Sequence, residues 1–142
     1  MEEKEIKILL VEDLEEHVLI IRTVLERSRL RNRVFVASDG EAALDFLYNR
    51  GDYADEKKYP KPDIILLDLR LPKLDGIEVL EQIKQEEELK DIPVVVLTSS
   101  ARDDDIIKTY EEGVKSYILK SAFIVQKRGK MEGLLDAIIS LV

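Results

Sequence analysis

The sequence predicts an α/β domain in which five parallel strands form a doubly wound sheet with helices on both faces. Short apolar runs alternate along the chain with longer segments whose apolar residues recur at helical spacing. The central run, residues 64–67, is apolar at every position, which is typical of a strand buried on both faces of a parallel sheet. The connections between the runs are long enough to hold helices, as parallel crossovers require.

The N-terminal part of the chain predicts two strand and helix pairs. Residues 6–11 form the first strand, and residues 33–37 form the second. An apolar stripe at helical spacing predicts the first helix: Leu14, Val18, Ile21 and Leu25. His17 lies off that stripe and is predicted to face solvent, since the chain has no second histidine or cysteine with which to share a metal. Residues 38–41, Ser-Asp-Gly-Glu, match a capping box at the start of a second helix.

The second half continues the alternation. Residues 49–62 are polar and charged, which predicts a solvated surface loop. After the central strand, Asp75 begins a third helix, and residues 92–97 form a fourth strand. Residues 116–119 form the last strand.

Two further helices are expected around that last strand. Ser100 is predicted to cap the first of them, which runs to Glu112 and has acidic residues in its first turn. The second is a final amphipathic helix with an apolar stripe: Met131, Leu134, Leu135, Ile138 and Val142.

Composition limits the classes of function. With 142 residues and 45% hydrophobic residues, we expect one domain spanning residues 1–142, with no output domain. The chain has no cysteine and one histidine, which excludes thiol chemistry and disfavours a Ser-His-Asp triad. A net charge of -8 opposes direct binding to nucleic acid. The acidic N-terminus and the lack of a long apolar run predict a cytoplasmic protein without a membrane partner.

Polar residues follow four of the predicted strands, and the carboxyl ends of parallel strands meet at one edge of the sheet. They are Glu12, Asp13, Asp68, Thr98 and Lys120. Three carboxylates at one place repel one another unless a lysine or a cation lies between them, and an all-oxygen site favours Mg2+. With a phosphoryl donor bound there, Asp68 could attack phosphorus to form an aspartyl phosphate, and Thr98 and Lys120 could stabilise its oxygens.

Four motifs give the chain a resemblance to the receiver domain of two-component response regulators, which has a flavodoxin-like (βα)5 fold. They are Leu-Val-Glu12-Asp13, Leu-Leu-Asp68-Leu-Arg-Leu-Pro-Lys-Leu-Asp-Gly76, Pro93-Val-Val-Val-Leu-Thr98-Ser and Tyr117-Ile-Leu-Lys120. The resemblance implies that Asp68 accepts phosphate from a histidine kinase. It also implies that Glu12, Asp13, Asp68 and the carbonyl of Arg70 bind Mg2+, and that Thr98 and Tyr117 form a conformational switch.

The sequence departs from the family at Ser121, where the family usually has proline after the lysine. The segment Lys120-Ser121-Ala, with the long loop before Pro62, is similar to stand-alone regulators that partner phytochrome-type kinases. In the family, the positions of Arg70 and Ser100 tune the lifetime of the phosphate.

The main interpretation is a phosphorylation switch that is not itself an enzyme. Its output would be a protein partner or a homodimer, formed through the last strand and residues 123–130. A pseudo-receiver adaptor, which binds partners without phosphorylation, is the alternative. An aspartyl phosphohydrolase is disfavoured because Arg70 stands where those enzymes carry a second aspartate. A flavodoxin is disfavoured because no phosphate-binding loop follows the first strand.

Overall fold

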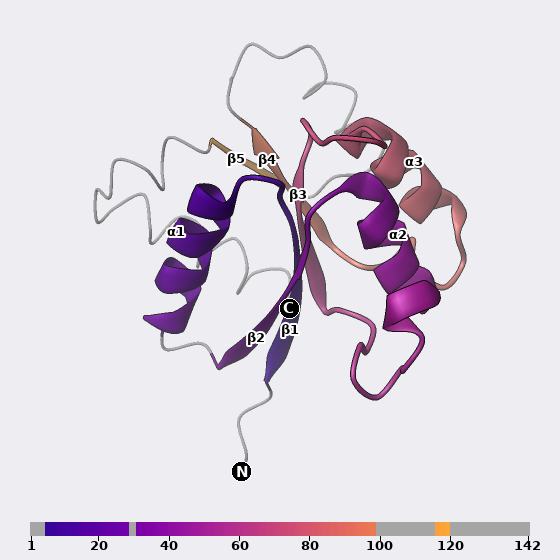
Figure 1. Cartoon of the computed structure of the whole chain (residues 1–142), viewed down its shortest axis with the longest axis horizontal. Helices are drawn as coiled ribbons and strands as arrows, with labels where there is room; N and C mark the ends of the chain where they lie inside the picture. The colour runs from indigo at the N-terminus through magenta and orange to yellow at the C-terminus, as the bar shows by residue number, and fades with distance from the viewer. Residues whose placement is uncertain (1–4, 29–30, 99–115, 120–142) are drawn as a thin grey trace.

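The computed structural model describes residues 5–28, 31–98 and 116–119, the last four and Thr98 through their backbone. Five strands form one parallel sheet in the order β2-β1-β3-β4-β5 (Figure 1). They are β1 (Ile6–Val11), β2 (Asn32–Ala37), β3 (Ile64–Asp68), β4 (Val94–Thr98) and β5 (Ser116–Leu119). The predicted parallel, doubly wound sheet is confirmed.

The strand register brings the ends of β1 and β3 to the same edge of the sheet. Val11, the last residue of β1, pairs with Leu67 of β3 and with Ala37 of β2. Asp68 is one residue further along β3 and pairs with Leu97. The residues that follow Val11 therefore emerge beside Asp68, as the sequence predicted.

Helices cover both faces of the sheet. α1 (Glu15–Glu26) lies on one face, and α2 (Gly40–Tyr48) and α3 (Gly76–Gln85) lie on the other (Figure 1). Alternate residues of β3 supply the two cores: Ile64 and Leu66 pack toward α1, and Ile65 and Leu67 pack toward α2 and α3. All four are fully buried, and burial of each side chain stabilises the fold by about 1.5–3 kcal/mol. A run without polar positions is therefore what this central strand requires.

Three predicted element starts are wrong by one or two residues. β2 begins at Asn32, one residue before the predicted start at residue 33. β4 begins at Val94, not at residue 92, because Pro93 has no N–H for the ladder, although its carbonyl accepts from the Ile65 N–H at 3.0 Å. The cap of α2 is Asp39, not Ser38: its carboxylate accepts from the Ala42 N–H at 2.8 Å. The capping side chain thus stands one residue later than the predicted capping box.

Residues 49–62 are not a simple solvated spacer, which corrects the prediction. The segment, here called the aromatic loop, contains the 3-10 turn η1 (Gly51–Tyr53) and folds back on α2. Tyr53 and Tyr59 pack against Phe46, with ring centroids 5.4 and 5.7 Å away. Asn49, at the end of α2, has a left-handed backbone and donates through Nδ2 to the carbonyls of both tyrosines. The charged residues of the loop remain exposed.

The predicted helix from Ser100 to Glu112 and the predicted final helix lie outside the described residues, so both stay predictions.

Candidate functional site

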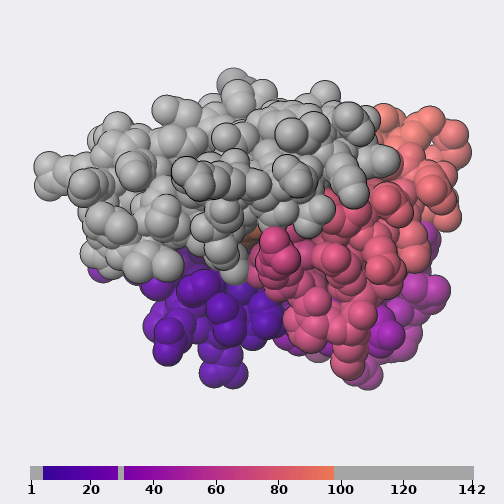
Figure 2. All heavy atoms as spheres, turned by 90° about the horizontal axis from the view of Figure 1, so that it is seen from above, coloured from indigo at the N-terminus to yellow at the C-terminus, as the bar shows by residue number. Residues whose placement is uncertain are grey.

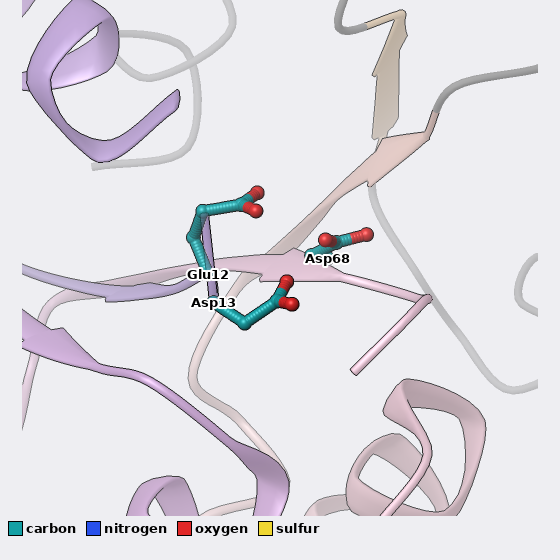
Figure 3. Close-up of side chains that lie close together, drawn as sticks. All are labelled: Glu12, Asp13 and Asp68. Carbon is teal, nitrogen blue, oxygen red and sulfur yellow. The ribbon is translucent and has the colours of Figure 1, made fainter. Parts of the chain in front are cut away.

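Three carboxylates meet at the carboxyl edge of the sheet. Glu12 and Asp13 follow β1, and Asp68 is the last residue of β3. Figure 3 shows their side chains gathered at one place, and one oxygen from each lies within 4.8 Å of the other two. The structure therefore brings together the acidic residues that the sequence singled out.

The three carboxylates differ in exposure. Glu12 and Asp68 are each only 1% exposed, whereas Asp13 is exposed. Backbone amides offset part of the cost of burial: the Leu14 N–H donates to Glu12 Oε1 at 3.2 Å, and the Arg70 N–H donates to Asp68 Oδ1 at 3.0 Å. The buried pair is thus held in place by local turns, and Asp13 forms the open side of the cluster.

His17 lies in this neighbourhood, so the prediction that it faces solvent is wrong. Its Nδ1 is 3.7 Å from Glu12 Oε1, and its side chain is only 22% exposed. Residues 12–14 alone connect β1 to α1, so the first turn of the helix, which contains His17, begins close to Glu12. The spacing from Glu12 to His17 could have suggested this contact. The apolar stripe of the helix predicts only which residues face the sheet, and not the neighbours of the other residues.

The first and last residues of the loop from Asp68 to α3 are in close contact with each other. The Gly76 N–H donates to the Leu69 carbonyl at 3.1 Å. A Cβ at Gly76 would meet the Asp68 carbonyl oxygen and lie 2.6 Å from Leu69 Cα. Glycine is therefore required at residue 76, because any side chain would push the backbone of Asp68 away. The side chain of Arg70, whose carbonyl is a predicted ligand, is exposed.

A cavity of about 300 Å3 opens beside the cluster, between α1 and the end of β2. Glu12 and Asp13 form part of its wall, together with apolar atoms of Val18 and Val36. Seen from above, the α1 region, in indigo, lies beside the segment that follows β3, in pink (Figure 2). Asp13 is exposed, so the acidic cluster reaches the surface through this residue.

The remaining predicted site residues are described less fully. Thr98 ends β4 and pairs with Leu119, and Tyr117 pairs with Val96. The backbone therefore places Thr98 one residue beyond Leu97, the partner of Asp68. The side chains of Thr98 and Tyr117, and all of Lys120, lie outside the described residues, so their roles stay predictions.

The chemistry of the donor set fits a hard divalent cation. Carboxylate oxygens are the ligands that Mg2+ and Mn2+ prefer, whereas softer metals favour imidazole or thiolate. A cation would also offset the repulsion among three carboxylates at this distance. The cluster therefore suggests a divalent metal site.

Comparison with known proteins decides the family. Residues 8–128 match the model of the response regulator receiver domain. This chain is a member of that family. The regulator Rcp1 of Synechocystis sp. is 47% identical over 114 residues, which is 80% of this chain and 76% of Rcp1.

Solved structures of response regulators have the same fold over nearly the whole chain. The Mn2+-bound form of Rcp1 aligns with a TM-score of 0.78 at 42% identity, covering 94% of this chain and 91% of that one. The phosphorylated cyanobacterial phytochrome response regulator RcpA aligns with a TM-score of 0.86 at 40% identity, covering 98% and 97%. The receiver domain is thus similar to phytochrome response regulators. No helix in the part of the chain that the structure describes is long and apolar enough to cross a membrane.

Proposed function

We propose that this chain is a stand-alone response regulator in which Asp68 accepts a phosphoryl group from a histidine kinase in a Mg2+-dependent reaction. The observation that carries the proposal is the buried Asp68 carboxylate at the end of β3, in one cluster with Glu12 and Asp13. A structural domain gains nothing from three like charges placed this close together. A phosphoacceptor site requires them.

The reaction is a transfer from nitrogen to oxygen. A carboxylate oxygen of Asp68 attacks the phosphorus of the phosphohistidine, and the bond from phosphorus to nitrogen breaks with its electron pair going to the imidazole. The Arg70 N–H bond to Oδ1 fixes the orientation of the carboxylate. We assign Thr98 and Lys120 to the transferred oxygens, where a hydroxyl and an ammonium group stabilise the developing charge.

The proposed ligands of Mg2+ are Glu12, Asp13, Asp68 and the carbonyl of Arg70. When bound, the ion supplies positive charge that offsets the charge of the phosphoryl group. The Mn2+ in the structure of Rcp1 and the phosphorylated state of RcpA support this assignment, because both are relatives with matching folds.

The same relatives support the partner, whereas the output is proposed from the sequence. We propose a phytochrome-type histidine kinase as the donor, since RcpA is a phytochrome response regulator. Within residues 1–142 we propose a single receiver domain whose Thr98 and Tyr117 switch changes the surface near β5. Its output is a protein contact or a homodimer through β5 and residues 123–130. Light scattering with and without phosphorylation tests the homodimer.

The decisive experiment is the intact mass of the protein after incubation with Mg2+ and acetyl phosphate. We expect one phosphate adduct, which an excess of chelator and the Asp68→Asn substitution each abolish. Asp52→Asn is a matched control, because Asp52 is an exposed carboxylate of the aromatic loop. If the unaltered chain binds Mg2+ but a phosphorylated kinase also fails to label it, the chain is a pseudo-receiver adaptor instead. The same assay, followed over repeated additions of acetyl phosphate, shows whether the chain turns over phosphate as an enzyme would.

A further inference from the structure

The loop that carries the phosphoacceptor is supported from a second place, the first turn of α2. Gly40 is the first residue of this helix and is buried. A Cβ built on Gly40 would meet the Leu74 carbonyl oxygen and lie 2.7 Å from Leu74 Cβ. The backbone of α2 therefore lies directly against residues 69–75, with no room for a side chain between them.

A side-chain contact reinforces the backbone contact. Lys73 Nζ lies 3.5 Å from Asp39 Oδ2, while the other oxygen of Asp39 caps α2 through the Ala42 N–H. Lys73 has a φ of 63°, a left-handed conformation that is unfavourable for a lysine. The residue of this loop that contacts Asp39 is thus the one with the unfavourable left-handed backbone conformation.

The contact with α2 can act on Asp68 because the loop is short and closed. Its two ends are joined by the bond from the Gly76 N–H to the Leu69 carbonyl, and Gly76 lies against the Asp68 backbone. Because the loop is short, a displacement of Leu74 shifts Arg70 as well. The Arg70 carbonyl, a proposed ligand of Mg2+, moves with it. Mg2+ demands near-ideal octahedral geometry, which makes its affinity sensitive to such a shift.

We infer that Gly40 is a positioning residue for the phosphorylation site: the first turn of α2 sets where residues 69–75 lie and thereby sets the affinity of the site for Mg2+. The inference rests on the proposed function and deepens it. A glycine that served helix packing alone would affect the stability of the protein and leave the metal site unchanged.

The test compares two glycines that lie in different surroundings. Gly40→Ala introduces a methyl group against Leu74 while favouring the helical conformation. Gly51→Ala is the matched control, because Gly51 has a φ of 56° and nothing within 4 Å of its built Cβ. It strains the backbone of the aromatic loop without touching residues 69–75. Both variants are compared with the unaltered chain for Mg2+ affinity by calorimetry, and for amide hydrogen exchange in residues 69–76.

We expect Gly40→Ala to weaken Mg2+ binding by roughly 10- to 100-fold, the range for lost outer-shell support of a metal site. We expect faster exchange of the Arg70 and Gly76 amides as well. Gly51→Ala should bind Mg2+ as tightly as the unaltered chain. Equal Mg2+ affinity and equal exchange in Gly40→Ala and the unaltered chain would overturn the inference while leaving the proposed function intact.

A second variant covers the case in which Gly40→Ala does not fold. Leu74→Ala removes most of a partly buried side chain that packs against the core cluster to which α2 and α3 contribute, and adds no clash. It should weaken Mg2+ binding several-fold and speed the same amide exchange; unchanged values in this variant also overturn the inference. Absence of Mg2+ binding in the unaltered chain itself would instead refute the proposed function, and the inference with it.

Discussion

Charged side chains are buried at the carboxyl edge of the sheet and exposed in the aromatic loop. In the aromatic loop, residues 49–62, the charged side chains are exposed and the tyrosine rings pack inward. At the carboxyl edge, Glu12 and Asp68 are buried within 4.8 Å of each other and of Asp13. The loop follows the rule for a stable fold, in which charges stay in water and apolar surface is removed from it. The edge breaks that rule, as expected for the phosphorylation site that we propose there.

The two regions also differ in what holds them together. The aromatic loop depends on ring contacts among Phe46, Tyr53 and Tyr59, with centroids 5.0–5.7 Å apart. The edge depends on backbone amides that donate to carboxylates. A substitution among the ring contacts of the aromatic loop should therefore affect the stability of the protein. A substitution at the carboxyl edge should affect the binding of a cation.

The largest effect is expected at Phe46 of α2, against which the tyrosines of the aromatic loop pack. Phe46 is 2% exposed and contacts Phe35 as well as both tyrosines. Phe46→Ala should lower the free energy of unfolding by about 3–5 kcal/mol, as expected for loss of a buried ring and the cavity that it leaves. Urea denaturation measures this loss.

The same variant, studied below its unfolding transition, should keep the Mg2+ affinity of the unaltered chain. Phe46→Leu is the matched control that retains an apolar side chain at this position, and it should recover more than half of the lost stability. If Phe46→Ala remains folded but binds Mg2+ more weakly, the two regions are coupled and the separation fails.

Asp13→Asn should make the chain more stable than the unaltered chain without Mg2+, and less stable than the unaltered chain with Mg2+. It removes one charge from the exposed side of the cluster. Without Mg2+, relief of repulsion should raise the free energy of unfolding by about 1 kcal/mol. With Mg2+, the unaltered chain should be the more stable one, because a cation that binds only the folded state stabilises it. Thermal unfolding with and without Mg2+ measures both.

Asp52→Asn, at an exposed carboxylate of the aromatic loop, serves as the control and should change neither value by more than about 0.5 kcal/mol. The hypothesis of a repulsive cluster is wrong if Asp13→Asn also destabilises the chain in the absence of Mg2+.

The sequence was informative where a single local signal decides the structure. The apolar runs predicted the parallel strands, because a strand buried on both faces tolerates no polar alternation. The acidic residues after the first and third strands were predicted to converge, because parallel strands share one carboxyl edge; Glu12, Asp13 and Asp68 do so.

What the sequence did not predict depends on contacts between distant segments. Tyr53 and Tyr59 pack with Phe35 and Phe46, which belong to other elements, whereas the polarity of residues 49–62 alone predicts a spacer. The position of His17, with Nδ1 3.7 Å from Glu12 Oε1, joins a helix residue to a residue that follows a strand. Neither contact can be predicted from the hydrophobic periodicity of a single segment.

Asn49 offers an effect smaller than that of Phe46, at the point where the aromatic loop leaves α2. Its φ is 53°, and its Nδ2 donates to the carbonyls of Tyr53 and Tyr59 at 3.1 and 2.9 Å. Asn49→Gly keeps the left-handed conformation but loses both bonds, which should cost about 1–2 kcal/mol. Asn49→Ala should cost about 1 kcal/mol more, because alanine resists that conformation. Equal stabilities of the two variants in urea denaturation would show that the backbone conformation does not contribute.

The smallest effect concerns alkaline pH and two tyrosines, Tyr48 at the end of α2 and Tyr53 in the aromatic loop. Burial raises the pKa of Tyr48 above its ordinary value of 10.0, with the nearby Glu86 carboxylate and its hydrogen bond adding to the shift. Burial likewise raises the pKa of Tyr53. A raised tyrosine pKa means that the folded state holds its proton more tightly than the unfolded state. The resulting stability is complete below the unfolded pKa of 10.0 and is lost as pH rises through the folded pKa.

Tyr48→Phe should therefore flatten the decline of stability at alkaline pH, and the double substitution with Tyr53→Phe should flatten it further. Urea denaturation at several values between about pH 8 and about pH 11 measures the slope, since both tyrosines begin to titrate there. Neither substitution touches the carboxylate cluster, so Mg2+ affinity at neutral pH should stay the same. An unchanged slope in the double variant would mean that the folded and unfolded states release these protons alike. The alkaline loss of stability would then arise elsewhere than in the contacts of Tyr48 and Tyr53.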